Sequence, residues 1–246
     1  GKKIFREKER ASWFSHKAET SKPYYYNVYL ADFDITAELT ATERAASFQF
    51  TYPENDNSYV VIDAFDKGSY IKILPNEKRV IGYSTRNSGG VPANFKNYFV
   101  IQFDKEFVSS EVWHDSVLVK DVLELTANHS GAIIGFKTAK GEKVNVKAAS
   151  SFISIDQAIY NLESETKGND FNQLVAASKK HWNTILGRVK AEGGSESQLR
   201  TFYSCLYRTV CFPQKHYEID RSGKMVHYSP YNGQVLPGYM YAGTGF

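Results

Sequence analysis

Short apolar or aromatic runs separated by polar breaks dominate residues 24 to 154. In the run from 34 to 42, Ile35 and Leu39 fall on one face of an extended chain and Glu38 falls on the other. So many short strands in one stretch require two packed sheets, and the pattern predicts a mainly β fold, a two-sheet antiparallel β-sandwich. About eleven such runs occur, at 24–30, 34–42, 47–53, 59–65, 70–74, 79–85, 98–104, 110–119, 123–127, 131–138 and 143–154.

The hydrophobic period changes from two to 3.6 residues near Ser154. Ser154 and Gln157 have the spacing of a capping box, and apolar residues at helical spacing follow them, so a first helix is expected here. A second amphipathic helix is predicted over 171–189, with Asn169 or Asp170 as its cap. Both helices need a surface to pack against.

A third helix is predicted from Ser197 to Phe212, where Pro213 ends it. Its apolar stripe is broad, and a lone helix of this kind cannot complete a core, because domains need at least two packed layers. After this helix, "HYEID" and "MVHYS" flank "RSGK", which indicates a hairpin. The stripe comprises Leu199, Phe202, Tyr203, Leu206, Val210 and Cys211.

These patterns divide the chain into three parts. Residues 1–154 are predicted to form the β-sandwich domain, 155–196 a helical linker, and 197–246 the start of a helical domain that continues further. The chain begins without an initiator Met or an apolar signal segment, and it ends on an aromatic, glycine-rich stretch that closes with Phe246. We therefore expect a piece of a longer protein, with the partners of the third helix beyond Phe246.

Composition and charge argue against some classes of function. The net charge of +3 comes from scattered Lys and Arg with no long basic run, which argues against nucleic-acid binding, and nothing in the chain resembles a membrane span. Aromatic residues make up 15% of the chain, a bias that suits strands and also sugar-stacking surfaces. Cys205 and Cys211 are six residues apart in a predicted helix, so they are not expected to form a disulfide.

Two pairs of residues could take part in metal binding or catalysis. His16 and Glu19 are close enough to share a site, but a metal would need further ligands that cannot be placed, and a hydrogen bond that pins the loop to the first strand is the simpler interpretation. Glu38 and Glu43 could form the carboxylate pair of a glycosidase. Glu43 is more simply an ion-pair partner of Arg44 or another neighbour.

The remaining polar residues suggest no active site. His114 and His129 stand without Cys, Asp or Glu at ligand spacing, and "NSGG" at 87–90 is a turn rather than a phosphate-binding loop. No Ser lies in a G-x-S-x-G motif. On the residues alone, we predict no catalytic residue and no metal ligand in this chain, and its substrate-binding residues stay unknown.

Four stretches taken together resemble the N-terminal part of the glycoside hydrolase family 92 α-mannosidases. "FSHKAETSKPYYYNVYLADFDITAELTATERAASFQFTYP" (14–53) is similar to that family's Ser-His…Glu…Pro-x-Tyr-Tyr strand followed by its Ala-Glu-Leu-Thr-Ala-Thr-x-Arg strand. "HWNTILGRV" (181–189) and "FYSCLYRTVCFPQ" (202–214) match in the helices. "PGYMYAGTGF" (237–246) resembles the approach to the family's Trp-Asp motif, so the similarity spans nearly the whole chain.

The resemblance implies a β-sandwich, linker helices and the first helix of an (α/α)6 catalytic barrel. Members are calcium-dependent exo-α-mannosidases that invert the anomeric centre and act on mannose-rich glycans, and the calcium ligands, acid and base come from the barrel. No catalytic or metal residue carries over to a position here, so the chain alone is expected to be inactive and to pack against the missing barrel. A glycine-rich segment before Gly1 that helps close the pocket is also expected to be lacking. An extracytoplasmic location (periplasm, cell surface or secreted) is expected too.

Two other functions remain open. In a carbohydrate-binding sandwich, surface aromatics would form a line on one sheet face and stack on sugar rings. In a purely structural domain that docks the barrel, a large apolar patch would be exposed around the helix that starts at Ser197.

Overall fold

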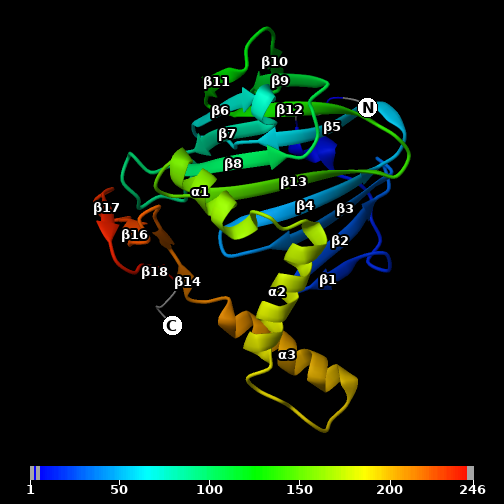
Figure 1. Cartoon of the computed structure of the whole chain (residues 1–246), viewed down its shortest axis with the longest axis vertical. Coiled ribbons are helices and arrows are strands. Elements are labelled where there is room, and N and C mark those ends of the chain that lie inside the picture. Colours follow the sequence, from blue (N-terminus) through cyan, green and yellow to red (C-terminus); the bar gives the residue numbers. More distant parts are fainter. Residues whose placement is uncertain (1–2, 4–5, 243–246) are drawn as a thin grey trace.

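The computed structural model describes residue 3 and residues 6–242 of the 246-residue chain (Figure 1). In this part, the larger sheet has nine antiparallel strands in the order β1-β2-β3-β4-β13-β8-β7-β6-β11. The strands are β1 (Thr20–Lys22), β2 (Tyr25–Leu30), β3 (Ile35–Ala41), β4 (Ala45–Tyr52), β6 (Ser69–Leu74), β7 (Arg79–Ser84), β8 (Asn97–Phe103), β11 (Glu124–Ala127) and β13 (Glu142–Ser151).

A smaller antiparallel sheet packs on the larger one. Within the described residues it has four strands in the order β10-β9-β12-β5, namely β5 (Asn55–Asp63), β9 (Ser109–His114), β10 (Val117–Val119) and β12 (Ser130–Thr138). The core between the sheets includes Ile71, Val80, Ile134 and Phe136, all exposed by 1% or less. The predicted mainly β sandwich is thus confirmed.

Within the two sheets of the sandwich, the number of strands differs from the prediction in two places. The predicted run 110–119 is two strands, because Asp115 and Ser116 adopt positive φ angles in a tight turn between β9 and β10. The short strand β1 was not predicted, because its residues "TSK" carry no apolar alternation. It adds to the edge of the larger sheet by pairing with β2.

Glycine is required where Trp113 crosses β12. A Cβ built on Gly131 would lie 2.2 Å from Cζ2 of Trp113 and 2.3 Å from the carbonyl oxygen of Ile62. The indole is 1% exposed, so neither the ring nor the neighbouring strand has room to move. The bare backbone of Gly131 therefore lets the largest core side chain lie flat against the sheet.

Helix α1 (Ile155–Thr166) lies across the outer face of the larger sheet, over β8 and β13 (Figure 1). It buries Ala158 and Leu162 against that sheet. Ser154 caps the helix by accepting a hydrogen bond from the backbone N–H of Gln157, as predicted. The side chain of Gln157 does not complete the expected capping box, because it donates instead to Asn161 and to the carbonyl oxygen of Ile219.

Two further α-helices lie beside the sandwich, as predicted. Helix α2 (Phe171–Leu186) is capped by Asp170, buries Phe171 and Leu174, and contacts β2, β3 and β4. Helix α3 (Glu196–Val210) is capped by Ser195 and touches α2, but it has no buried residue. Both caps are complete capping boxes.

The residues after α3 form two small sheets. The predicted hairpin is β15 (Tyr217–Ile219) with β16 (Met225–Tyr228), and β17 (Val235–Pro237) pairs with β16. A second ladder joins β14 (Gln214–Lys215) to β18 (Tyr241–Ala242). Cys205 and Cys211 are both free thiols, as expected from their spacing.

Candidate functional site

The predicted pair His16 and Glu19 does come together. Nδ1 of His16 lies 2.6 Å from a carboxylate oxygen of Glu19. Hydrogen bonds, first from the Tyr26 hydroxyl and then from His16, lower the pKa of Glu19. Because Tyr26 belongs to β2, the pair pins the loop to the sheet, which is the structural role expected for it.

Glu38 and Glu43 are engaged by different partners. The hydroxyl of Tyr25 donates to Glu38 at 2.7 Å. Glu43 accepts from Arg44 at 3.1 Å and from Lys215 at 2.7 Å. The interpretation of Glu43 as an ion-pair partner is therefore confirmed, and neither carboxylate is arranged to act on a shared substrate.

The view of His129 as an isolated imidazole is wrong. Nε2 of His129 lies 2.7 Å from Oδ1 of Asp63, and Arg10 binds the other oxygen at 2.5 Å. Asp63 is 66 residues away in sequence, at the end of β5, whereas His129 lies in the bend just before β12, so ligand spacing could not reveal the contact. Nδ1 of His114 lies 3.4 Å from a carboxylate oxygen of its neighbour Asp115.

The segment 87–90 is a turn, as predicted. Gly89 and Gly90 both have positive φ, and the side chain of Asn87 accepts a hydrogen bond from the backbone N–H of Gly89. The segment joins β7 to β8, with no helix after it that could provide an anion site.

The turn between β3 and β4 holds the C-terminal segment through a network of charged residues. Arg44 bonds Glu43, lies 3.6 Å from Glu165 of α1, and donates to the backbone carbonyl of Tyr217. Lys215 reaches Glu43 from the other side. We call Glu43, Arg44, Glu165 and Lys215 the turn network.

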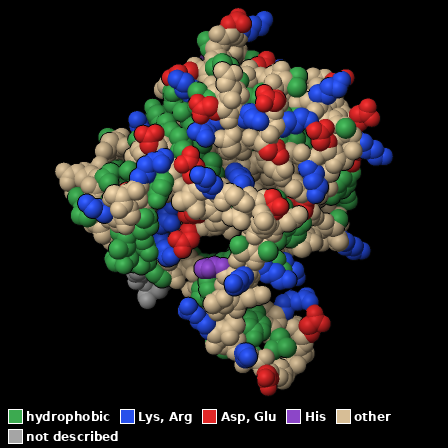
Figure 2. Space-filling view, viewed as in Figure 1, with side chains coloured by type: hydrophobic (Ala, Val, Ile, Leu, Met, Phe, Trp, Pro, Cys, Tyr) green, Lys and Arg blue, Asp and Glu red, His purple; other side chains and the backbone are tan. Residues whose placement is uncertain are grey.

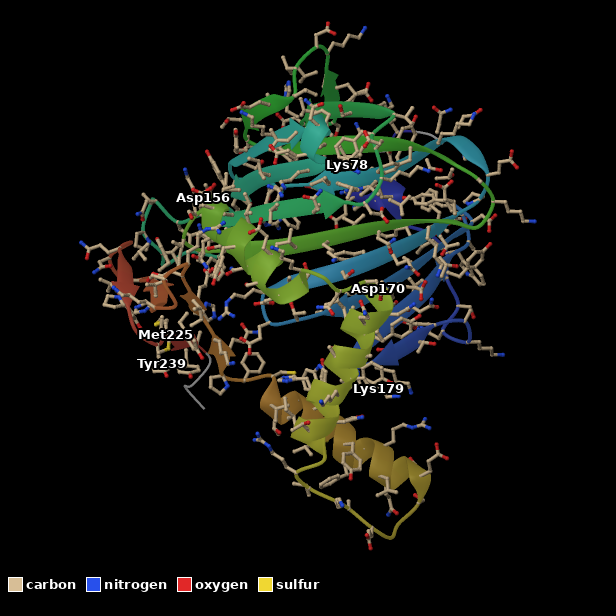
Figure 3. The ribbon with its side chains drawn as sticks, in the orientation of Figure 1. Lys78, Asp156, Asp170, Lys179, Met225 and Tyr239 are labelled. Atoms are coloured by element: carbon tan, nitrogen blue, oxygen red, sulfur yellow. The ribbon has the colours of Figure 1, made fainter. Side chains whose placement is uncertain are left out.

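A tyrosine cluster lies beside the turn network. It consists of Tyr217, Tyr239 and Tyr241. Figure 2 shows hydrophobic side chains gathered over β16 and β17, with charged side chains beside them toward the sandwich. In Figure 3, Tyr239 lies next to Met225 on this part of the molecule, whereas Lys179 lies on α2.

A buried carboxylate joins the same segment to the sandwich from the inside. Glu218 is 4% exposed and accepts hydrogen bonds from Ser151 Oγ at 3.0 Å, the backbone N–H of Phe152 at 2.9 Å and Asn161 Nδ2 at 2.7 Å. It thus links β15 to the end of β13 and to α1. In the sequence, the role of Glu218 could have been suspected because it is an acidic residue inside the short apolar strand "YEI".

A line of surface aromatics is also present on the outer face of the larger sheet. Tyr70, Tyr83 and Tyr98 are register partners on β6, β7 and β8. Their ring faces are largely taken up by one another, because Tyr70 stacks on Tyr83 with centroids 5.3 Å apart and Lys96 lies 4.0 Å from the Tyr83 centroid. This line is better explained as a cross-strand ladder that stabilises the sheet.

The side chains described above do not form a set of ligands that fits a metal ion. Among residue 3 and residues 6–242, no group of three or more His, Cys, Asp or Glu side chains is arranged to hold one. Calcium would need six to eight oxygen ligands, and each carboxylate named above is already bonded to cationic, hydroxyl or amide groups.

Comparison with known proteins identifies the family. A model of the glycosyl hydrolase family 92 N-terminal domain matches residues 1–151, and a model of the family's catalytic domain matches residues 157–246. The chain belongs to glycosyl hydrolase family 92. The resemblance drawn from the sequence motifs is thereby confirmed, whereas the finer division at residues 154 and 196 stays a prediction.

Solved structures of this family share the fold over nearly the whole chain. The inverting mannosidase BT2199 of Bacteroides thetaiotaomicron is 41% identical with a TM-score of 0.94, and it covers 98% of this chain. The α-mannosidase BT3965 of the same organism is 28% identical with a TM-score of 0.82 over 94% of this chain, and its complex with mannoimidazole has also been solved. The chain spans only 33% and 32% of these two relatives.

One curated relative is described as a secreted protein. A secreted glycosidase of Arthroderma benhamiae is 24% identical over 238 residues, which cover 86% of this chain and 31% of that protein. In the described part of this chain, no helix is both long and apolar enough to cross a membrane.

Proposed function

We propose that the protein containing this chain is an inverting exo-α-mannosidase that acts on mannose-rich glycans. The observation that carries the proposal is the 41% identity to an inverting family 92 mannosidase over 98% of this chain. This likeness includes both the sandwich and the segment matched by the catalytic-domain model. A mannoimidazole complex of a second family member supports mannose as the sugar.

Inversion requires two carboxyl groups about 6.5 to 9.5 Å apart, with a water between them. Glu38 and Glu43 do not supply this pair, because each is held by other side chains. We place the acid, the base and a calcium site in the part of the protein that corresponds to the relatives' remaining length. Calcium dependence, action on N-glycans and an extracytoplasmic location remain parts of the proposal.

Within that enzyme, helix α3 provides a contact surface for the rest of the catalytic domain. The supporting observation is the apolar stripe of α3, on which Phe202 and Val210 are 39% and 40% exposed. Such a face on a helix without any buried residue is suited to cover by further helices. We propose that the helical part of the same protein packs there.

The test compares the full-length protein with this chain on one α-mannobiose. The full-length protein is expected to release mannose, to lose activity with a chelator, and to give the β-anomer first in NMR spectra. The chain alone is expected to release none, because loss of a general acid and a general base removes about 10² to 10⁴ in rate for each. Turnover by the chain would place the active site within it, and a retaining or chelator-insensitive full-length enzyme would contradict the proposed mechanism.

A further inference from the structure

The net positive charge of the chain is concentrated at its N-terminal end. Residues 1–10 contain five Lys or Arg residues and two Glu residues, whereas residues 11–246 contain equal numbers of basic and acidic residues. The formal charge of +3 therefore belongs to the first ten residues, which we call the basic segment. Such a segment is attracted to an acidic surface.

The outer face of the smaller sheet offers matching acidic groups. Two neighbouring rows of register partners cross three strands of this face, namely Asp63, Gly131 and Trp113, and next to them Val61, Ile133 and Glu111. Their neighbours in sequence belong to the core between the two sheets, so these residues face outward. Both charged residues in the two rows are acidic. Ile133 is 0% exposed and Trp113 is 1% exposed, so this outer face is covered.

The basic segment reaches both carboxylates. Lys3 binds Glu111 on β9, and its Nζ lies 5.8 Å from the ring centroid of Tyr59 on β5. Nη2 of Arg10 donates to Oδ2 of Asp63 at 2.5 Å. The four side chains of these ion pairs are 17% to 32% exposed, so solvent and salt screen them less than a fully exposed pair. Two ion pairs therefore fasten the segment to the smaller sheet.

Beyond Arg10, the chain is fixed to the larger sheet instead. The backbone N–H of Trp13 donates to Asp32 at 2.7 Å, and the carbonyl oxygen of Trp13 accepts from the N–H of Ala31 at 3.0 Å. Both partners lie in the turn between β2 and β3. Loss of the ion pairs on the smaller sheet leaves these contacts in place, so the basic segment can leave its face while the sandwich stays folded.

We propose that the outer face of the smaller sheet is a docking site for the basic segment, and that a second copy of this chain can supply the segment. Charge selects the occupant, because the face presents two carboxylates and the basic segment holds the whole net charge of the chain. A second copy presents Lys3 and Arg10 at the same spacing, so two copies that exchange their segments form a dimer. The proposal does not rest on the proposed function.

The first measurement tests the docking site with a synthetic peptide of residues 1–11, followed by fluorescence anisotropy at low salt. In the 246-residue variant Lys3→Ala/Arg10→Ala, the segment of the chain itself loses both ion pairs and leaves the face free. The peptide is expected to bind this variant with a Kd on the order of 0.1 mM. The unsubstituted chain is expected to bind it at least about tenfold more weakly, because its own segment competes at a high effective concentration.

The second measurement tests exchange between copies by sedimentation velocity. Glu111→Gln weakens the face and keeps the segment, so its mixture with Lys3→Ala/Arg10→Ala is expected to form heterodimers, whereas each variant alone stays mostly monomeric. Glu142→Gln replaces Glu111→Gln in the control mixture. Glu142 forms a comparable ion pair with Lys105, with side chains 34% and 26% exposed, but it lies on β13 of the larger sheet. The control mixture is expected to stay monomeric.

Melting temperatures of all variants check that the sandwich remains folded. The docking site is overturned if the peptide does not bind Lys3→Ala/Arg10→Ala, or if it binds the unsubstituted chain equally well. It is also overturned if a scrambled peptide of the same composition binds as tightly, which would show a surface that attracts any cationic chain. A mixture of the complementary variants without heterodimers, or a control mixture with as many, overturns the exchange between copies.

Discussion

His129 and Asp63 are neighbours in space, with Nε2 and Oδ1 only 2.7 Å apart, although Asp63 ends strand β5 and His129 lies in the bend just before β12. The other oxygen of Asp63 binds Arg10, which belongs to the short 3-10 helix Glu7–Arg10. The Asp63 side chain is 17% exposed. One carboxylate therefore fastens the N-terminal segment to the smaller sheet.

Asp63 should make the stability of the chain depend on acid pH. Burial opposes its ionisation, but hydrogen bonds from His129, the backbone N–H of Phe65 and Arg10 outweigh burial, so the pKa of Asp63 lies below its usual value. Its stabilising contribution is complete above the unfolded-state pKa of about 3.9 and is lost as the pH falls through the lower folded-state value. We expect Asp63→Asn to lower the free energy of unfolding by about 1 to 3 kcal/mol at pH 7.

Urea unfolding between pH 2.5 and 7 checks this prediction. The curves of Asp63→Asn and the unsubstituted chain should approach each other toward the acid end, because Asp63 takes up a proton as the pH falls. Asp56→Asn is the control, since Asp56 forms an ion pair with Lys137 in which both side chains are 74% exposed. The control should leave the pH profile nearly unchanged, and equal effects of the two substitutions would contradict the role given to Asp63.

Glu218 should hold the small C-terminal sheet on the sandwich. Glu218→Ala leaves three donors from Ser151, Phe152 and Asn161 without their acceptor in a buried site. We expect a loss of about 2 to 4 kcal/mol in the free energy of unfolding, with faster amide hydrogen exchange over 217–237. Ile219→Ala on the same strand is the control, since Ile219 is 38% exposed, and an equal loss in both variants would argue against a specific anchor.

Gly131 should tolerate no side chain. Gly131→Ala places a methyl group against the buried Trp113 ring and the Ile62 carbonyl, and should lower the free energy of unfolding by about 3 kcal/mol. Gly90→Ala is a comparison of a different kind, because its Cβ meets nothing within 4 Å and only its positive φ of 79° causes strain. In thermal unfolding, Gly131→Ala should have a much lower melting temperature than Gly90→Ala. The reverse order would contradict the steric argument.

The two complete capping boxes should contribute differently to global stability. Asp170→Ala should cost about 1 kcal/mol of global unfolding free energy, because the first turn of α2 buries Phe171 and Leu174 on the rest of the fold. Ser195→Ala should instead increase exchange only within α3, which has no buried residue. Calorimetry measures the change in global stability, and amide hydrogen exchange measures the local opening of α3. A global loss from Ser195→Ala would show that α3 is more firmly packed than its exposure indicates.

The sequence predicted the architecture well because strands and helices leave periodic signals. Ile35 and Leu39 alternate with polar residues, and Ser154 and Asp170 mark helix starts, so the sandwich and the helices could be placed from local pattern alone. The contacts of the candidate site could not be placed in this way, because they join residues distant in sequence. Lys215 meets Glu43 across 172 positions, and no spacing rule connects them.

Strands β12 and β13 come last in the chain of the sandwich and yet lie inside the two sheets, with β12 between β9 and β5 in the smaller sheet and β13 between β4 and β8 in the larger one. During synthesis, the meanders β1–β4 and β6–β8 can form early, but neither sheet is complete until the ribosome has released residues 130–151. Until then, the edges of β4 and β5 remain unpaired and open to association with other chains. The nascent protein is therefore most prone to aggregate just before these two strands emerge, and its final ordering should be slow because the closing pairs are far apart in sequence.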